Sequence, residues 1–249
     1  MIHPELHTNP VALDRQQHRL MRFKLEGNDN DRFAALNSMF VVVGEFGEAC
    51  KEYPLVWIEA GQDAQGVRQV APIAVFGLIK GQNLCLEGGA WRTDYMPVAM
   101  RMYPFALARS GDVQYAVCHD ANSMRLSVTE GEALFDAEGN PTAFLQDVQR
   151  QLEQVEMEVE RTRQMGLELL RLDLLRDMRF EAKLPDGTSV GVDGFLTVDD
   201  QRFAELPDAE VVKLHKSGGL GLIHAHRLSL SNMRRLAHWH AQRHGKAAA

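Results

Sequence analysis

A change in hydrophobic period near residue 175 constrains this chain more than any other feature of its sequence. Upstream, an apolar seam repeats at spacings of three and four residues, which is typical of an amphipathic helix. Asn140 and Pro141 stand where a helix N-cap and a first helical residue are favoured. After Leu175 the period becomes two, with a turn at Pro185-Asp186-Gly187, which predicts a β-hairpin. The members of the seam are Leu145, Val148, Leu152, Val155 and Val159, and its spacing ends at Thr162 and Gly166.

The rest of the chain adds strands before the helix and helices after the hairpin. Buried strands are predicted at 55–58 and 70–79, and a strand pair is predicted around Ser110-Gly111-Asp112. Residues 220–228 fit a strand or a helix equally well. This order predicts an α+β fold with a mainly antiparallel sheet, a long central helix and a C-terminal hairpin plus helices.

The length and the two ends of the chain suggest how it is organised. A chain of 249 residues fits one large domain or two small ones, and we expect a single domain over 1–249. Pro4 and Pro10 block an early helix, so residues 1–30 are expected to form an extended N-terminal arm. Residues 246–249, Lys-Ala-Ala-Ala, have the composition of a cloning remnant and carry no weight in the fold prediction.

Charge is unevenly distributed along the chain. Twenty-seven Lys and Arg against 34 Asp and Glu give a net charge of −7, which argues against a protein built mainly to bind nucleic acid. Residues 211–249 contain no acidic side chain and carry +7, so residues 1–210 carry −14. Two interpretations stay open for this basic end. It packs on the acidic body or is solvated, or it forms a patch for an anionic partner.

Cysteine usage and hydropathy bear on the compartment. The three cysteines are widely spaced, so a disulfide framework and a Cys-rich zinc site are not expected, and a reducing compartment fits best. The N-terminus has no apolar core of the kind found in secretory signals. The longest apolar stretch, 70–79, is ten residues, whereas a membrane-spanning helix needs about 20. We therefore expect a cytoplasmic protein without a membrane span.

Histidine pairs are the strongest candidates for metal ligands. On a strand, His224 and His226 would face the same side and fit one metal, whereas on a helix they diverge. No carboxylate follows Glu210, and no Glu follows the first histidine of the His240 and His244 pair. Nucleophile-elbow, P-loop and dinucleotide-binding patterns are also missing from the sequence. We expect no metal and no cofactor, assign no catalytic residue, and favour a protein that is not an enzyme.

The segment from Trp91 to Phe105 is unusually dense. It holds four aromatic residues, two arginines and two prolines within 15 positions. Arginine beside aromatic rings can stack on them or bind a carboxylate with two hydrogen bonds. One interpretation is a structural crossing that fills the core, and the other is the wall of a ligand-binding or peptide-binding groove. The candidate groove residues are Trp91, Tyr95, Arg101 and Tyr103, with Asp193 and His226 contributed by the C-terminal part.

This segment also resembles the bacterial SapC family. It carries the pattern W-x-x-x-Y-x-P-x-x-x-R-x-Y-P-F, and further similar positions follow in the C-terminal third. The resemblance covers most of the chain, and His224 departs from the aromatic residue expected at its place. The positions that carry it are Trp91, Tyr95, Pro97, Arg101, Tyr103, Pro104, Phe105, Asp193-Gly194-Phe195, Val198-Asp199, Leu206, Leu214, Gly219-Leu220, Ala225-His226 and Ser229-Leu230.

The resemblance implies a cellular setting for the protein and supplies no specific reaction. The family is associated with a surface-layer (S-layer) gene cluster, and its members neighbour outer-membrane receptors, flavin halogenases and cupin-type oxygenases. A peptide-transporter permease of the same name is a different, membrane-spanning protein. We expect a soluble accessory or binding protein of an S-layer or envelope-associated system, with a protein or a small molecule as its ligand. The alternative is an oxygenase-like or tailoring enzyme acting with a flavin halogenase or a cupin-type partner. A homo-oligomer stays open.

Overall fold

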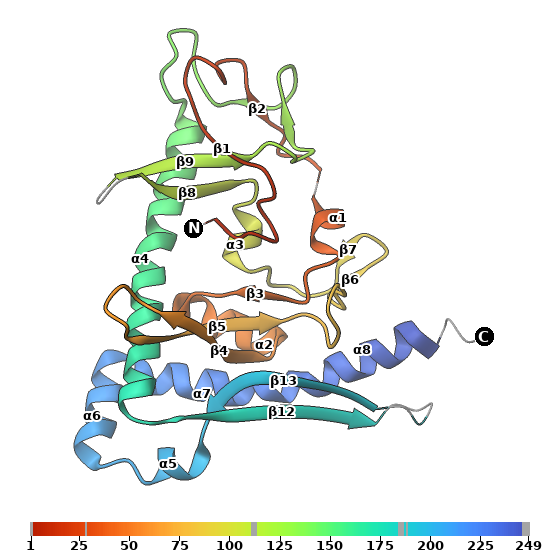
Figure 1. Ribbon diagram of the computed structural model, residues 1–249. Helices are drawn as coiled ribbons and strands as arrows, with labels where there is room; N and C mark the ends of the chain where they lie inside the picture. Colours follow the sequence, from red (N-terminus) through yellow and green to blue (C-terminus); the bar gives the residue numbers. More distant parts are fainter. Residues whose placement is uncertain (1, 28, 111–113, 184–186, 188, 246–249) are drawn as a thin grey trace. The chain divides into compact units, whose positions relative to one another are not determined.

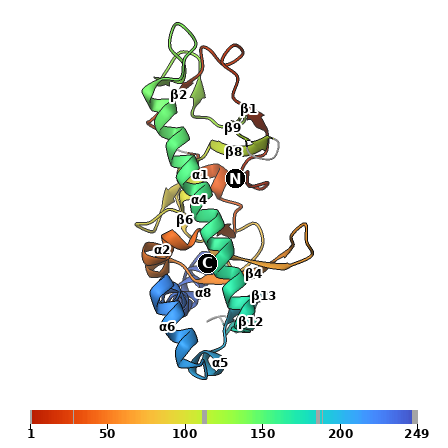
Figure 2. The same cartoon turned by 90° about the vertical axis from the view of Figure 1, so that its left-hand side faces the viewer.

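A computed structural model describes residues 2–27, 29–110, 114–183, 187 and 189–245 (Figures 1 and 2). The expected cloning remnant at 246–249, Gly111-Asp112 and Pro185-Asp186 lie outside the described residues. The strands are β1 (Pro10–Ala12), β2 (Arg22–Phe23), β3 (Ser38–Phe40), β4 (Leu55–Gln62), β5 (Arg68–Val75), β6 (Leu86–Glu87), β7 (Ala90–Trp91), β8 (Phe105–Ser110), β9 (Gln114–Asp120), β10 (Leu126–Ser127), β11 (Glu132–Ala133), β12 (Leu175–Lys183) and β13 (Ser189–Val198). The helices are α1 (Asn30–Phe33), α2 (Phe46–Glu52), α3 (Val98–Arg101), α4 (Ala143–Arg171), α5 (Asp200–Ala204), α6 (Asp208–Ser217), α7 (Gly219–Ser229) and α8 (Met233–Gly245), with 3₁₀ turns at Val43–Glu45 and Leu230–Asn232.

The chain forms two compact units, and each is built from two separate stretches of sequence. The first unit comprises Met1–Phe33 and Val98–Met157, and the second comprises Ala34–Pro97 and Glu158–Ala249. The boundary between Pro97 and Val98 falls inside the aromatic segment that carries the family resemblance. Helix α4 supplies residues to both units.

Two small antiparallel sheets make up the strand part of the first unit. Strand β9 pairs with β8 and β1, and β2 pairs with β10 and β11. The N-terminal arm contributes two short strands, β1 and β2, to these sheets. The apolar core of the first unit combines strand, loop and helix side chains. Its buried members are Phe23, Phe105, Leu107, Leu134, Phe135, Leu145, Val148 and Leu152.

One five-stranded antiparallel sheet, in the order β12-β13-β4-β5-β3, organises the second unit. Leu175 pairs with Val198 at one end of the predicted hairpin, and Lys183 pairs with Ser189 at the other. Helix α7 contacts α2, β4 and β13. The α+β prediction, with its long helix and its C-terminal hairpin and helices, is confirmed. No helix among the described residues is long and apolar enough to cross a membrane.

Helix α4 explains why its hydrophobic seam ends where it does. The Thr162 hydroxyl accepts the Val43 N–H at 2.9 Å, so a polar residue replaces the apolar one. At Gly166 a Cβ atom would lie 2.9 Å from the Val70 carbonyl oxygen, so helix and sheet meet too closely for a side chain. The helix begins at Ala143 and not at Pro141, because Thr142 takes the N-cap position and its hydroxyl accepts the Leu145 N–H at 3.4 Å.

Residues 220–228, which fit a strand or a helix by sequence, lie within helix α7 (Gly219–Ser229). Gly218 ends α6 in the left-handed conformation, with φ of 81°, and is also the N-cap of α7. A left-handed residue at a helix end is most easily supplied by glycine, so the chain turns here without strain. His224 and His226 therefore diverge around a helix, which removes the strand geometry that two ligands to one metal would need.

Candidate functional site

The six residues predicted for the groove divide between the two units. Trp91, Tyr95, Asp193 and His226 belong to the second unit, whereas Arg101 and Tyr103 belong to the first. Each group is therefore described within its own unit, starting from the contacts of each side chain.

Trp91 and Tyr95 surround a buried tyrosine that the sequence analysis did not identify. Tyr53, which follows α2 and is fully buried, accepts a hydrogen bond from the Trp91 indole N–H at 3.0 Å. Its hydroxyl lies 2.5 Å from the Thr93 hydroxyl and donates to the Tyr95 carbonyl. Burial raises the pKa of Tyr53, so the hydroxyl stays protonated and can serve all these partners. We call Tyr53, Trp91, Thr93 and Tyr95 the Tyr53 cluster.

The Tyr95 side chain reaches a buried carboxylate. Its hydroxyl donates to Glu45 Oε1 at 2.8 Å, and Glu45 is 6% exposed. The other oxygen of Glu45 accepts the Val42 N–H at 3.0 Å, at the start of the 3₁₀ turn that leads into α2. Tyr95 is thus tied to the α2 end of the second unit through one charged hydrogen bond.

Tyr103 makes the equivalent contact in the first unit. Its hydroxyl donates to Asp120 Oδ2 at 3.1 Å, and both side chains are buried. Asp120 also accepts the N–H groups of Thr8 at 2.9 Å, Asn9 at 3.2 Å and Asn122 at 3.0 Å. Burial by itself would raise the pKa of Asp120, but these donors outweigh it and lower the pKa. Burial and the neighbouring carboxylate both raise the pKa of Tyr103.

His7 lies against Tyr103, with 5.6 Å between the ring centroids. Its Nδ1 accepts the His3 N–H at 3.1 Å, while its buried Nε2 has no partner among the described residues. Burial lowers the pKa of His7, so the ring is neutral and carries its proton on Nε2. His7, Tyr103 and Asp120 are the residue types of an acid–base site. The oxygens of Asp120, however, are already occupied by the four donors described above.

Arg101 and Asp193 are both exposed. Arg101 ends the short helix α3, where the prolines on either side leave room for one helical turn. Asp193 precedes Gly194, which has φ of 80° where the β12–β13 register shifts and forms a bulge. Within the second unit, no hydrogen bond or ion pair joins Asp193 to Trp91 or Tyr95 among the described residues.

His226 is a core histidine that joins two strands. Its Nδ1 lies 2.8 Å from the Leu55 carbonyl oxygen, and its Nε2 accepts the Val198 N–H at 3.1 Å. The Thr197 hydroxyl also lies 3.0 Å from Nε2. These partners place the proton on Nδ1, and burial lowers the pKa of His226 to about 4. Both ring nitrogens hold β4 and β13 together, so His226 offers none to a ligand in this state.

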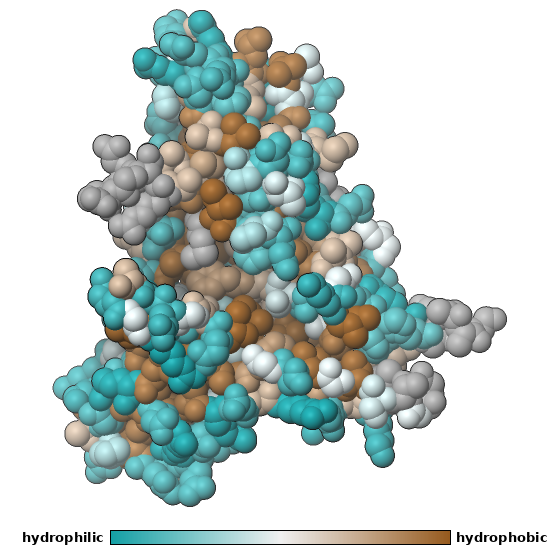
Figure 3. Space-filling view, in the orientation of Figure 1, coloured by the Kyte–Doolittle hydropathy of each residue, from teal (hydrophilic) through white to brown (hydrophobic). Residues whose placement is uncertain are grey.

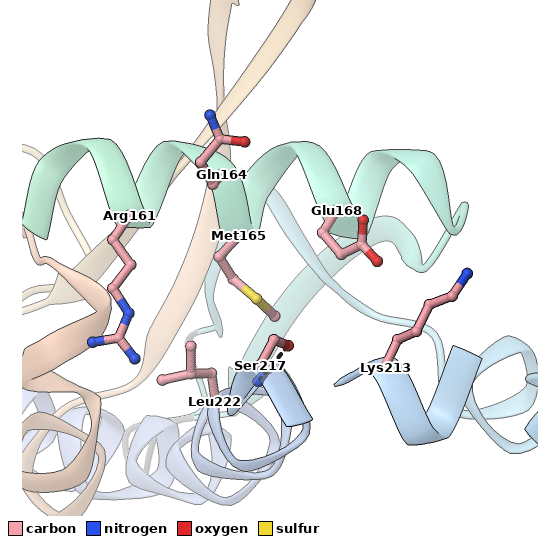
Figure 4. Close-up of a pocket in the computed structure, with 8 residues that line it drawn as sticks. Arg161, Gln164, Met165, Glu168, Lys213, Ser217 and Leu222 are labelled. Atoms are coloured by element: carbon pink, nitrogen blue, oxygen red, sulfur yellow. Dashed lines mark hydrogen bonds between the residues drawn. The ribbon is translucent and has the colours of Figure 1, made fainter. Parts of the chain in front are cut away.

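A pocket of about 320 Å³ lies between α4, α6 and α7 (Figure 4). Met165 and Leu222 approach each other across its middle, while Arg161 stands at one end and Lys213 at the other. The Gln164 side chain points away to the far side of α4. The lining residues are Arg161, Gln164, Met165, Glu168, Lys213, Ser217, Gly219 and Leu222.

The charges of this pocket are partly compensated from outside it. Glu168 is held by two hydrogen bonds from Arg171, at 2.7 and 2.8 Å, which lower its pKa. Lys213 pairs with Glu210 at 2.8 Å, and Arg161 lies 3.4 Å from Glu158. The anion of the lining is therefore neutralised by a guanidinium, and each of the two cations, at opposite ends of an apolar floor, also has a carboxylate partner. Among the lining residues, only Lys213 was indicated by the sequence, because it belongs to the basic end of the chain.

Comparison with known proteins places the chain in a family but gives no individual relative. A protein-family model described as SapC matches residues 13–236, which includes most of both units. No curated protein and no solved structure matches the chain.

Proposed function

The chain belongs to the SapC family, and we propose that it is an accessory binding protein of an S-layer or envelope-associated system. The family resemblance supplies that setting. The ligand class is an amphiphilic anion, meaning an apolar group that carries a carboxylate, sulfonate or phosphate.

The observation that carries this proposal is the pocket between α4, α6 and α7. An apolar floor of Met165 and Leu222 favours burial of a hydrophobic group. Arg161 or Lys213, at the two ends, would then pair with the acidic group. A preformed hollow with few charged groups around an apolar centre is the usual form of a small-ligand site.

The contacts of the aromatic segment support binding over catalysis. Hydrogen bonds join the polar side-chain atoms of Tyr53, Trp91 and Tyr95 to one another or to Glu45. The Tyr103 hydroxyl is bonded to Asp120. Such hydrogen-bonded groups, buried or half-buried, stabilise a fold, whereas a catalytic group needs a polar atom directed at its substrate. In this proposal the segment holds each unit together, and the pocket takes the ligand.

The test is a fluorescence titration with anilinonaphthalene sulfonate, which combines an aromatic group with one anion. We expect saturable binding to one site on the folded wild-type protein. Arg161→Gln and Lys213→Gln should each weaken it by roughly threefold to tenfold, because each removes one charge partner. Arg163→Gln is the matched control, since Arg163 lies on the same helix but pairs with Glu160 outside the pocket. Binding that is equal in all four proteins would contradict the proposal.

The envelope role requires a test in cells. In a strain from which the gene for this protein is deleted, we expect impaired assembly of the surface layer or of the envelope component with which the protein acts. The wild-type chain should restore assembly, and the Arg161→Gln/Lys213→Gln double variant should not, provided that both accumulate equally. Full restoration by the double variant would separate the envelope role from the pocket.

The alternative is an oxygenase-like or tailoring enzyme acting with a flavin halogenase or a cupin-type partner. The observation that favours it is the buried Nε2 of His7, which has no partner among the described residues and lies beside Tyr103. Elemental analysis of untagged protein distinguishes the two functions. Near-stoichiometric iron or zinc would favour the enzyme, and less than about one-tenth of an equivalent would favour the binding protein.

A further inference from the structure

Strand β12 forms one edge of the five-stranded sheet. It is nine residues long, and among the described strands it pairs with β13 alone. Figure 1 draws it as the outermost strand of that sheet. A long edge strand presents a row of unpaired N–H and C=O groups, and another strand can add to it.

The two faces of β12 differ in character. Arg176 and Met178 line a pocket with residues of α7, so the face of the even-numbered residues lies toward that helix. Successive side chains of a strand alternate, so the odd-numbered residues face the other way. From Asp177 onward these are all exposed and alternate in charge. In order they are Asp177, Arg179, Glu181 and Lys183. The space-filling view shows mainly hydrophilic residues along this border (Figure 3).

This alternation is self-complementary when a second β12 runs antiparallel about a two-fold axis at Phe180. Arg179 of one copy then stands opposite Glu181 of the other, and Asp177 stands opposite Lys183. The symmetry repeats both pairs, so four opposite-charge pairs form across the new ladder. Directly opposed side chains of unlike charge stabilise an antiparallel pair, and like charges destabilise it.

Neighbouring registers lose this match. An axis at Arg179 places Asp177 opposite Glu181 and Arg179 opposite itself. Another at Glu181 places Arg179 opposite Lys183 and Glu181 opposite itself. A shift of one strand by one residue would place the charged, odd-numbered side chains opposite even-numbered ones, which belong to the face toward α7. Parallel pairing in register would set every charge against its own copy.

The other face also fits the axis at Phe180. Phe180 meets its own copy, and Met178 meets Ala182, with all three half-buried in one chain. Pairing would remove more of this apolar surface from water. Arg179 and Glu181 already form an ion pair within one strand, at 2.6 Å, so the second copy would extend it into a network of four charges.

We propose that the β12 edge is a self-association surface, on which a second copy of this chain adds antiparallel with the two-fold axis at Phe180. Two five-stranded sheets then become one continuous ten-stranded sheet. Seven residues from each copy, Asp177–Lys183, take part in the pairing. An interface of this size is small, so the dimer forms at micromolar concentrations and exchanges with monomer.

Charge reversal tests both the surface and the register. Sedimentation velocity of the full chain, from about 1 to about 200 µM, should show a reversible monomer–dimer equilibrium. Arg179→Glu sets four acidic side chains around the axis, and Glu181→Arg sets four basic ones. Each should weaken dimerisation about tenfold or more. The Arg179→Glu/Glu181→Arg double variant restores every opposite-charge pair and should dimerise within about threefold of wild type.

The control is Arg163→Glu, which breaks the exposed Arg163–Glu160 pair of α4 and should leave the dimer unchanged. Circular dichroism confirms that each variant is folded. A monomeric wild type over the whole range would overturn the proposal. A dimer that survives both single reversals, or a double variant that stays monomeric, would also overturn it. None of these outcomes depends on ligand binding at the pocket of α4, α6 and α7.

Discussion

Two tyrosines of one short segment each donate a hydrogen bond to a buried carboxylate, one in each unit. The two carboxylates differ in what else they bind. Tyr95 donates to Glu45, which also accepts the N–H of Val42, three residues before it. Tyr103 donates to Asp120, which also accepts N–H groups from Thr8 and Asn9, more than 100 residues away. The first arrangement fixes a local turn. The second fastens the N-terminal arm to strand β9, so the same pair of side chains can serve local or long-range order.

The largest expected effect comes from removing the Asp120 carboxylate. Asp120→Ala leaves three backbone N–H groups and the Tyr103 hydroxyl without their acceptor, and we expect a loss of about 3 kcal/mol or more in the free energy of unfolding. Glu45→Ala should cost less, about 1 to 3 kcal/mol, because the Val42 N–H that it accepts lies in the same local turn, whereas Asp120 joins segments more than 100 residues apart. Urea unfolding measures both, and amide exchange at residues 8–12 should rise in the Asp120 variant.

Asp136→Ala is the control for this comparison. Asp136 accepts the N–H groups of Glu138 and Asn140 in the same unit, but it closes an exposed turn. Water can replace those bonds, so the cost should be clearly smaller than for Asp120. A Glu45 variant that is less stable than the Asp120 variant would reverse the comparison.

A smaller effect, about 2 kcal/mol between pH 7 and pH 5, is expected from His226. Burial lowers its pKa to about 4, so the unfolded chain takes up a proton at the ordinary value of 6.5 while the folded chain does not. The contribution of His226 is therefore complete above pH 6.5 and is lost progressively as the pH falls toward 4. Burial also lowers the pKa of His119, in the first unit, to about 4, which adds to the loss in the same direction.

Substitution by phenylalanine separates the two histidines. Both variants should reduce the pH dependence of the urea midpoint between 6.5 and 4. At pH 7, His226→Phe should be strongly destabilising because it breaks the bonds to Leu55 and Val198. His119→Phe should cost much less, since the buried Nδ1 of His119 has no partner among the described residues. Equal costs at pH 7 would mean that the bonds of His226 add nothing.

The smallest effects belong to the tyrosine hydroxyls. Tyr95→Phe and Tyr103→Phe each remove one hydrogen bond to a carboxylate and should cost about 1 to 2 kcal/mol. Double-mutant cycles with Glu45→Gln and Asp120→Asn should give coupling energies of about 1 kcal/mol. A coupling energy near zero in either cycle would mean that the hydrogen bond of that tyrosine to its carboxylate adds nothing to stability.

The sequence predicted the elements whose signals are local. The seam of Leu145 to Val159 and the period of two after Leu175 are repeats over neighbouring residues, and both became the expected helix and hairpin. Residues 220–228 stayed ambiguous because apolar residues and histidines there fit either period. In the structure they form α7, whose His226 is bonded to β4 and β13, and such contacts between elements distant in sequence leave no local signal.

Partners that are distant in sequence could not be predicted. The aromatic segment pointed to Trp91, Tyr95 and Tyr103, but their partners Tyr53, Glu45 and Asp120 lie 17 to 50 residues away in the sequence. One of the two interpretations made the aromatic segment a single groove wall, and the boundary of the two units passes through that segment between Pro97 and Val98. The pocket was missed for the same reason, because Arg161 and Lys213 lie on different helices and are more than 50 residues apart in the sequence.

The contact at Gly166 limits how this family member can vary. A methyl group there would meet the carbonyl oxygen of Val70 at 2.9 Å and a side-chain carbon of Val70 at 3.1 Å. A smaller residue at position 70 removes the second obstacle, but every residue keeps its carbonyl oxygen. No single change on the strand can therefore compensate for a larger residue on the helix. Genetic suppressors of such a change would have to move α4 itself, so position 166 evolves alone and stays glycine for as long as the helix keeps its place on the sheet.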